Sequence, residues 1–254
     1  MRYALFSDIH SNRHAFEACL AHANLQGADR IVVLGDLVSY GAHPAEVVVR
    51  CQAIEHEGGI VLRGNHEELI QDRNLGKSPL QQTLGAQTAK WTHEQLSSEQ
   101  RLWLDQLPRT AVEEDIFFVH ASANAPEQWH YVENARSAGA SLDAACAEAP
   151  VRYVFGGHVH QQTLYFRGTG RELMPFKPVA GIPVHTPRHR QWLATIGSVG
   201  QPRDGNVRAM YALFDSSAQQ LTFHRVAYDY LAAARSVRAA GLPDFFADRL
   251  EKGR

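Results

Sequence analysis

The stretch Tyr3-Ala4-Leu5-Phe6-Ser7-Asp8-Ile9-His10 joins a short apolar run to two metal-capable side chains. Continuous apolar runs of this length are typical of strands that are buried on both faces. Helical patterns follow the early runs, because Ser11-Asn12 can cap one helix and Pro44 can begin another. The start of the chain therefore has the order β-α-β-α-β, which predicts an α/β fold. From such runs we expect strands at residues 3–6, 31–34, 60–62, 116–119, 153–155, 192–196, 210–214 and 221–226.

Polar side chains that can bind metals follow five of these runs directly. The motifs are Asp8-Ile9-His10, Gly35-Asp36, Gly64-Asn65-His66-Glu67, His120 and Gly156-Gly157-His158-Val159-His160. In open α/β sheets, ligands bind at the carboxyl ends of the strands. Any one of these motifs arises easily by chance, whereas five of them at five strand ends predict a shared site.

The spacing of the motifs explains how they could present ligands. Residues i and i+2 of an extended segment point to the same side, so Asp8 with His10, and His158 with His160, can each offer two ligands to one pocket. The full set is Asp8, His10, Asp36, Asn65, His120, His158 and His160, with His66 left over. These ligands are too many for one transition metal and suit two ions that share a bridging carboxylate. Mixed nitrogen and oxygen donors favour manganese, iron, zinc or nickel over magnesium or calcium.

The charge of such a site indicates the class of its ligand. Two divalent ions carry four positive charges, and Asp8, Asp36 and one bridging hydroxide return three negative charges, which leaves about +1. A pocket with this charge attracts an anion.

The composition is that of an ordinary globular protein, with 254 residues of which 44% are hydrophobic and 20% charged. We expect a single domain over residues 1–254. The net charge of −2 argues against a broad nucleic-acid-binding surface. Cys19, Cys51 and Cys146 show no CxxC spacing and fit a reducing compartment. The apolar run before Ser7 is too short for a signal peptide or a membrane span, so we expect a cytoplasmic protein without membrane association. The oligomeric state is not predicted.

Two segments interrupt the alternation of strands and helices. Residues 78–108 carry two capping-box patterns, Ser78-Pro79-Leu80-Gln81 and Ser97-Ser98-Glu99-Gln100, and predict a pair of helices without a strand. Residues 167–191 contain four prolines, three glycines and mostly basic charges, which predicts an irregular basic arm or a loose hairpin. We expect these two segments to form a cap that selects the substrate. Further helices are expected at about 137–149 and 228–240.

The five motifs resemble those of the calcineurin-like metallophosphoesterases, whose pattern runs Asp-x-His, Gly-Asp, Gly-Asn-His-Asp/Glu, His and Gly-His-x-His in this order. All five are present between Asp8 and His160. The resemblance implies a four-layer αββα sandwich with a two-metal phosphoesterase site, and the 78–108 segment would be a small helical cap insertion.

The resemblance also implies a role for each matching residue. Asp8, His10 and His160 would hold one metal, while Asn65, His120 and His158 would hold the other. Asp36 would bridge the two ions. His66 matches the family's candidate proton donor, which would assist the leaving oxygen while a metal-bridging hydroxide attacks phosphorus.

The segment Gly197-Ser198-Val199-Gly200-Gln201-Pro202-Arg203-Asp204-Gly205-Asn206 looks like a small bacterial branch of the same family. Thr195-Ile196 stand where an Asn-Pro pair is more usual, which removes any role of that asparagine. The segment is either a glycine-rich turn that closes the sheet or a loop that brings Arg203 near the substrate or a subunit interface.

The substrate implied is a small phosphorylated molecule, a nucleotide or a phosphoprotein, hydrolysed as a phosphomonoester or phosphodiester. The alternatives are a dinucleoside polyphosphate hydrolase and a protein serine/threonine phosphatase. The second is weakened because Ser39-Tyr40-Gly41 replaces the Asp-Arg-Gly of protein phosphatases. A competing class is a non-catalytic scaffold or ligand-binding module on the same fold.

Candidate substrate-binding residues are Asn65, Tyr40 and Arg203. Tyr40, Trp129 and Tyr131 each follow a proposed ligand closely. Their rings could stack on a nucleobase or could equally belong to the core.

Overall fold

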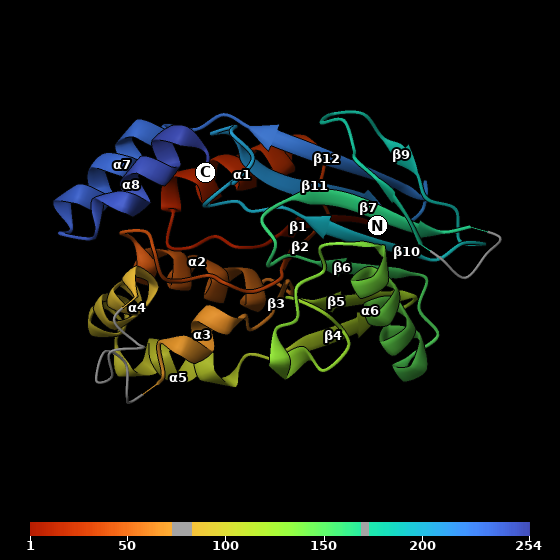
Figure 1. Ribbon diagram of the computed structural model, residues 1–254, viewed down its shortest axis with the longest axis horizontal. Helices are drawn as coiled ribbons and strands as arrows, with labels where there is room; N and C mark the ends of the chain where they lie inside the picture. Colours follow the sequence, from red (N-terminus) through yellow and green to blue (C-terminus); the bar gives the residue numbers. More distant parts are fainter. Residues whose placement is uncertain (73–82, 169–172) are drawn as a thin grey trace.

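The computed structural model describes residues 1–72, 83–168 and 173–254, in which two six-stranded sheets pack face to face (Figure 1). The first sheet has the order β3 (Ile60–Val61), β2 (Arg30–Val33), β1 (Arg2–Phe6), β11 (Ala209–Asp215), β12 (Gln220–Val226) and β9 (Val184–His185). The second has the order β4 (Thr110–Glu113), β5 (Ile116–Val119), β6 (Tyr153–Gly156), β10 (Trp192–Ile196), β7 (Gln162–Arg167) and β8 (Leu173–Phe176).

Helices flank the two sheets, and two of them pack on each other at the end of the molecule. The helices are α1 (Arg13–Leu25), α2 (Pro44–His56), α3 (Asn65–Leu69), α4 (Leu84–Gln95), α5 (Ser98–Gln106), the short 3-10 helix η2 (Pro126–Gln128), α6 (Ala135–Glu148), α7 (Tyr230–Ala239) and α8 (Asp244–Lys252). Figure 1 shows α1 and α6 on opposite outer sides of the pair of sheets.

Alternate side chains of β1 explain the layering of the first sheet. Tyr3 and Leu5 lie in the core between the sheets, together with aromatic side chains of β5 and β6. Ala4 and Phe6 point the opposite way, into the core beneath α1, where the rings of Phe6 and Phe16 lie 6.0 Å apart. Each large apolar side chain buried in this way contributes about 1.5–3 kcal/mol. Because both faces of β1 are covered, all of its side chains can be apolar, and this unbroken apolar run is what predicts the strand.

The second sheet is covered by α6 in the same manner. Phe117 of β5 and Val154 of β6 pack against Ala138 and Leu142 of α6. The order of layers is therefore helix, sheet, sheet, helix, which confirms the expected αββα sandwich.

The strand directions place one edge of each sheet at the candidate site. In the first sheet β1, β2 and β3 are parallel, and in the second β5, β6 and β10 are parallel. Parallel neighbours have their carboxyl ends at the same edge. The residues that follow β1, β2, β3, β5 and β6 therefore converge.

Several predicted helix starts are present in the structure. The Asn12 side chain accepts the Ala15 N–H at 3.1 Å and caps α1, and Pro44 is the first residue of α2. The capping box of Ser97 and Gln100 begins α5 as expected. α4 starts at Leu84 with Thr83 as its N-cap, while the predicted box at residues 78–81 lies outside the described residues.

The expected irregular arm at 167–191 is more regular than its proline content predicts. Its described residues include β8, which pairs antiparallel with β7, and β9, which pairs antiparallel with β12. Of the two predictions for this segment, the loose hairpin agrees better with the structure than the irregular arm. Pro175 is accommodated because β8 lies at the edge of its sheet, where a missing N–H costs no ladder hydrogen bond.

The sequence patterns also miss α3, α8, β4 and β7. The helix expected at about 228–240 is present as α7, and α8 follows it to form a helical pair at the end of the chain (Figure 1). None of the helices in residues 1–72, 83–168 and 173–254 has both the length and the apolarity needed to cross a bilayer.

Candidate metal centre

Backbone hydrogen bonds hold the ends of the two sheets together at the candidate site. The Asp8 N–H donates to the carbonyl of Gly35 at 3.0 Å within the first sheet. The Gly157 N–H donates to the carbonyl of His120 at 2.7 Å within the second. The His158 N–H then joins the two sheets by donating to Asp8 Oδ2 at 2.9 Å. Two main-chain hydrogen bonds and one to the Asp8 carboxylate therefore fix four of the five motifs relative to one another.

The backbone at these motifs is strained. Positive φ angles of 54°, 49°, 53°, 67° and 56° occur at Asp8, His10, Asp36, His158 and His160. Such angles cost a non-glycine residue about 1 kcal/mol or more, and strain of this kind clusters at functional sites. In this chain it turns the side chains after β1, β2 and β6 toward a common centre.

Two glycines allow close packing beside the site. A Cβ at Gly64 would collide with the Asp36 carboxylate, and a Cβ at Gly157 would collide with Ser7 and Asp8. Any larger residue at either position would displace a candidate ligand.

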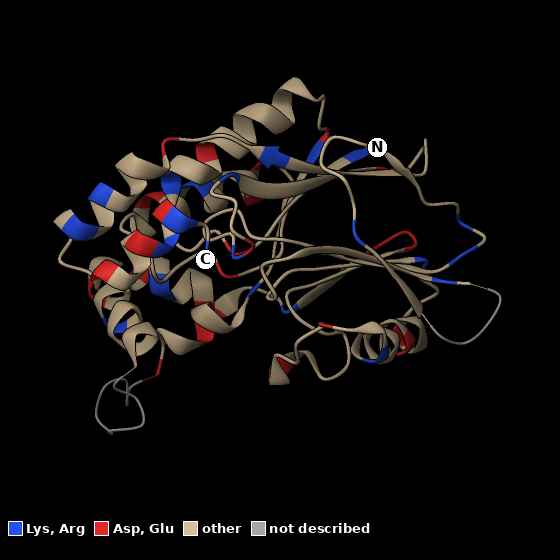
Figure 2. Ribbon diagram, turned by 45° about the horizontal axis from the view of Figure 1, so that its top comes forward, with Lys and Arg blue, Asp and Glu red and all other residues tan. Residues whose placement is uncertain are grey.

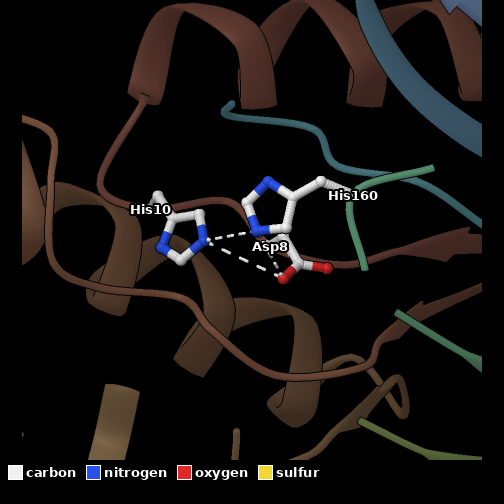
Figure 3. Close-up of side chains that lie close together, drawn as sticks. All are labelled: Asp8, His10 and His160. Atoms are coloured by element: carbon white, nitrogen blue, oxygen red, sulfur yellow. Dashed lines mark hydrogen bonds and ion pairs between the residues drawn. The ribbon is translucent and has the colours of Figure 1, made fainter. Parts of the chain in front are cut away.

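The first group of candidate ligands is Asp8, His10 and His160, shown in Figure 3. His160 Nε2 lies 3.2 Å from Asp8 Oδ1 and 3.2 Å from His10 Nε2. His10 Nε2 lies 3.8 Å from Asp8 Oδ1. All three side chains are buried, and Asp8 Oδ1 and the Nε2 atoms of the two histidines face one another.

The second group is Asp36, His120 and His158. His120 Nε2 lies 3.3 Å from Asp36 Oδ2, 3.2 Å from His158 Nδ1 and 3.2 Å from Asn65 Oδ1. Asp36 Oδ2 is also 3.9 Å from His10 Nε2 of the first group. Asp36 therefore lies between the two groups, and Asn65 adjoins the second.

Backbone carbonyls orient three of these imidazoles. The Nδ1 atoms of His10, His120 and His160 lie 3.2, 2.9 and 2.7 Å from the carbonyl oxygens of Val38, Leu34 and Gln201. Because a carbonyl oxygen only accepts, each Nδ1 carries a proton and donates it. In the neutral ring the Nε2 lone pair then points into the site, which is the usual arrangement of a metal-binding histidine.

The charges of the site favour a cation between these side chains. Burial acts to raise the pKa of Asp8 and Asp36, but the neighbouring histidines, foremost His160 and His120 respectively, outweigh it and hold both pKa values below their usual range. Burial acts to lower the pKa of His120, yet Asp36 outweighs it and raises that pKa to about 9. Burial and the nearby His120 lower the pKa of His158 to about 4. Two ionised carboxylates thus face neutral imidazoles such as His158. The proton that Asp36 stabilises on His120 lies where a metal could bind.

The donor set fits divalent transition metals. Asp8 Oδ1 is buried and makes no hydrogen bond with any described residue, although it points at two imidazoles. Buried carboxylate oxygens normally have partners, so an unpartnered one among histidine nitrogens is expected of a metal ligand.

Glu67 is a functional residue that the sequence-based assignment does not single out, although it lies in a quoted motif. Its fully buried carboxylate accepts four backbone N–H groups, from Gly64 at 2.7 Å, Asp36 at 2.9 Å, Leu37 at 2.8 Å and Val38 at 3.3 Å. Burial and the Asp36 charge raise the pKa of Glu67 to about 7, against the lowering effect of its backbone hydrogen bonds. Glu67 therefore ties the turn after β2 to the start of α3.

His66 lies beside the two groups of candidate ligands. Unlike His10, His120 and His160, its ring is not oriented by a backbone carbonyl of the residues that the structure describes. Its Nε2 lies 3.9 Å from Asp36 Oδ2, while its buried Nδ1 has no hydrogen-bond partner among the described residues. His66, His10 and Asp36 also form a third group that is close enough to hold an ion. Burial lowers the pKa of His66.

Tyr40 and Arg203 both lie next to the site. The Tyr40 ring packs against both His10 and His66, with ring centroids 4.5 and 4.6 Å away. It also stacks on Phe246 of α8 at 4.7 Å. Arg203 donates to Gln201 Oε1, and the Gln201 carbonyl accepts from His160. Gln201 thus connects Arg203 to the candidate ligand His160.

Trp129 and Tyr131 line the rim of the site rather than the core. Tyr131 is 54% exposed, and its ring stacks on His158 at 4.1 Å. Trp129 meets His120 edge to face at 5.9 Å, and the guanidinium of Arg109 lies over its ring. These two rings are available to an incoming molecule.

Comparison with known proteins agrees with this geometry. The family model described as calcineurin-like phosphoesterase matches residues 1–162. An uncharacterized protein of Methanocaldococcus jannaschii is 31% identical over 99% of this chain and 98% of its own length. The crystal structure of a metallophosphoesterase from Sphaerobacter thermophilus has 34% identity and a TM-score of 0.86, covering 100% of this chain and 99% of that one. A hypothetical protein from Pyrococcus horikoshii, 19% identical, shares the fold with a TM-score of 0.79 over 100% and 98% of the two chains.

Proposed function

Because the chain belongs to the calcineurin-like phosphoesterase family, we propose that it is a two-metal enzyme that hydrolyses a small phosphate ester. The observation that carries the proposal is the position of Asp36, whose Oδ2 lies 3.3 Å from His120 Nε2 in one ligand group and 3.9 Å from His10 Nε2 in the other. A carboxylate in that position can be shared by two ions.

We assign the ligands as two sets around this carboxylate. The first ion would be held by Asp8, His10 and His160 and the second by Asn65, His120 and His158, with Asp36 between them. Two divalent ions of manganese, iron, zinc or nickel would supply Lewis-acid stabilisation of the phosphoryl oxygens and a water-derived nucleophile.

The protein's own residues would hold the substrate and move its proton. His66 Nε2 faces the site and is the proposed donor of a proton to the leaving oxygen. Asn65, through its amide, and Arg203, through its guanidinium, are candidates to bind phosphoryl oxygens. Tyr40 would exclude water from one side, since its ring covers both His10 and His66.

The arrangement around Tyr40 favours a small substrate over a phosphoprotein. Ser39-Tyr40-Gly41 occupies the place of the protein-phosphatase Asp-Arg-Gly, and Tyr40 packs against α8 there. The exposed ring of Tyr131 beside His158 suits a substrate with an aromatic part, such as a nucleotide, and keeps a dinucleoside polyphosphate as a second candidate.

The test is hydrolysis of p-nitrophenyl phosphate and bis-p-nitrophenyl phosphate by the protein with added manganese and, in parallel, after removal of metal by a chelator. We expect metal-dependent hydrolysis of at least one ester, and the ratio of the two rates separates a monoesterase from a diesterase. Activity on neither ester in the metal-loaded protein would favour the scaffold alternative, which the intact donor set argues against.

A further inference from the structure

Two arginine side chains from distant parts of the chain meet at one neutral oxygen beside the candidate metal centre. Arg203 Nε and Nη2 donate to Gln201 Oε1 at 3.1 and 2.8 Å, and Arg249 Nη1 of α8 donates to the same atom at 3.0 Å. Gln201 is 2% exposed, whereas both arginines are half-buried and reach solvent. A single amide oxygen therefore holds two positive charges together.

Neither of these arginines has an ion pair with a carboxylate of residues 1–72, 83–168 or 173–254. The nearby acidic residues are engaged elsewhere. Asp204 pairs with Arg225, and Asp248 and Glu251 pair with Arg238 at 3.0 and 2.6 Å. Acidic and basic positions are interspersed on the helices of this part of the molecule (Figure 2), yet this one arginine pair is not neutralised.

Bringing two guanidiniums together without an anion is unfavourable. Burial, followed by the charge of Arg203, lowers the pKa of the Arg249 guanidinium. Arg203 Nη1 and Arg249 Nη2 form no hydrogen bonds with the described residues and can still donate. Planar guanidiniums with free N–H groups are well suited to bind the oxygens of a phosphate.

The pair is close to the site where the phosphoester would react. The backbone carbonyl of Gln201 accepts from His160 Nδ1 at 2.7 Å, so the residue that holds the arginines also orients a candidate ligand. Arg249 and Phe246 lie on the same helix, and Phe246 stacks on the Tyr40 ring that covers His10. The arginines thus lie on the α8 side of the site.

We propose that Arg203 and Arg249 form a subsite for a second phosphoryl group, so that the preferred substrate carries a phosphate in addition to the one that is hydrolysed. The inference rests on the proposed function and narrows its substrate class to bisphosphorylated small molecules or nucleotides with more than one phosphate. The scissile phosphoester would bind at the metals while the second phosphate accepts from Arg203 Nη1 and Arg249 Nη2.

Binding of phosphonates tests the subsite without turnover, because their C–P bonds are not hydrolysed. Alkyl monophosphonates and bisphosphonates with linkers of about one to six carbons would be titrated calorimetrically into the manganese-loaded full chain. The variants are Arg249→Gln, which keeps a donor for Gln201 but removes the charge, and Arg235→Gln, which removes a charge from the exposed face of α7. Metal chelation by a given ligand is the same for every variant, so comparison among variants isolates the arginines.

We expect the wild type to bind at least one bisphosphonate about tenfold or more tightly than the matching monophosphonate, as charge-assisted hydrogen bonds predict. Arg249→Gln should remove most of this preference, while Arg235→Gln should leave it within about twofold. The proposal is overturned if the wild type has no preference, or if Arg249→Gln weakens both ligands equally or neither. Failure of the enzyme to hydrolyse nitrophenyl esters would instead count against the proposed function, since the binding ratio does not depend on turnover.

Discussion

The Glu67 carboxylate accepts the backbone N–H of Asp36 at 2.9 Å. Glu67 is not a proposed ligand, but it positions Asp36, which lies between the two ligand groups. The link is reciprocal, because Asp36 Oδ1 accepts the backbone N–H of His66, the residue just before Glu67, at 2.9 Å. The turn after β2 and the start of α3 are therefore locked together by two carboxylates.

Glu67→Gln should destabilise the protein and weaken metal binding. An amide nitrogen in place of either carboxylate oxygen would face two N–H donors, so at least two hydrogen bonds to a charged acceptor would be lost. At pH 8 or above, where Glu67 with its pKa of about 7 is ionised, each such bond contributes about 1.5–3 kcal/mol, and the free energy of unfolding should fall by about 3 kcal/mol or more. Urea denaturation measures this change.

Glu68→Gln is the matched control for that substitution. Glu68 is partly exposed and makes an ion pair with Arg109 at 3.2 Å. Removal of an exposed pair changes stability by about 1 kcal/mol at most. Equal effects of the two substitutions would contradict the role given to Glu67.

Asp36→Asn should abolish both metal binding and hydrolysis while the fold persists. An asparagine oxygen can still accept the His66 N–H, but the charge that attracts two cations is lost. Element analysis after metal loading should find almost no bound metal. Asp143→Asn, at an exposed position of α6 paired with Arg167, should retain both metals and activity.

His66→Ala should keep its metals and lose most of its turnover. General acid catalysis contributes roughly 10²–10⁴-fold, and it matters most when the leaving oxygen is basic. The loss of kcat should therefore be larger for an alkyl phosphate than for p-nitrophenyl phosphate. His56→Ala on the exposed end of α2 is the control. Loss of metal together with rate would identify His66 as a ligand of the third group instead.

Removal of metal should lower thermal stability as well as activity. Ions that bind the folded chain and not the unfolded chain stabilise it according to their affinity and concentration. Dialysis against a chelator should lower Tm, and added manganese should restore it. The Asp36→Asn variant should show no such recovery, because its site no longer holds the ions.

Much of the fold could be predicted because its strands are short, apolar and covered on both faces. The run at residues 3–6 is unbroken since Ala4 and Phe6 face helices while Tyr3 and Leu5 face the second sheet. The sequence does not predict β7, because this strand buries only Leu164 and Tyr165, which are adjacent residues rather than alternate ones. A strand with that pattern has neither periodicity nor a long apolar run.

The proposed ligands could be predicted because each one directly follows a strand. The rest of the site depends on contacts between distant segments, which spacing does not reveal. Arg249 reaches Gln201 only because α8 folds back over Tyr40. The spacing of Phe246 and Leu250 after Pro243 is a signal that could have identified α8, which is not among the predicted helices, but it does not indicate what that helix approaches.

The central claim is that two metal ions held around Asp36 drive phosphoester hydrolysis. The most direct measurement is titration of metal-free protein with manganese, with bound metal and p-nitrophenyl and bis-p-nitrophenyl phosphate hydrolysis followed together. We predict that the rate for at least one ester rises with occupancy and levels off at about two ions for each chain. A metal-free protein that is fully active, or a protein with both ions bound that hydrolyses neither ester, would contradict the claim.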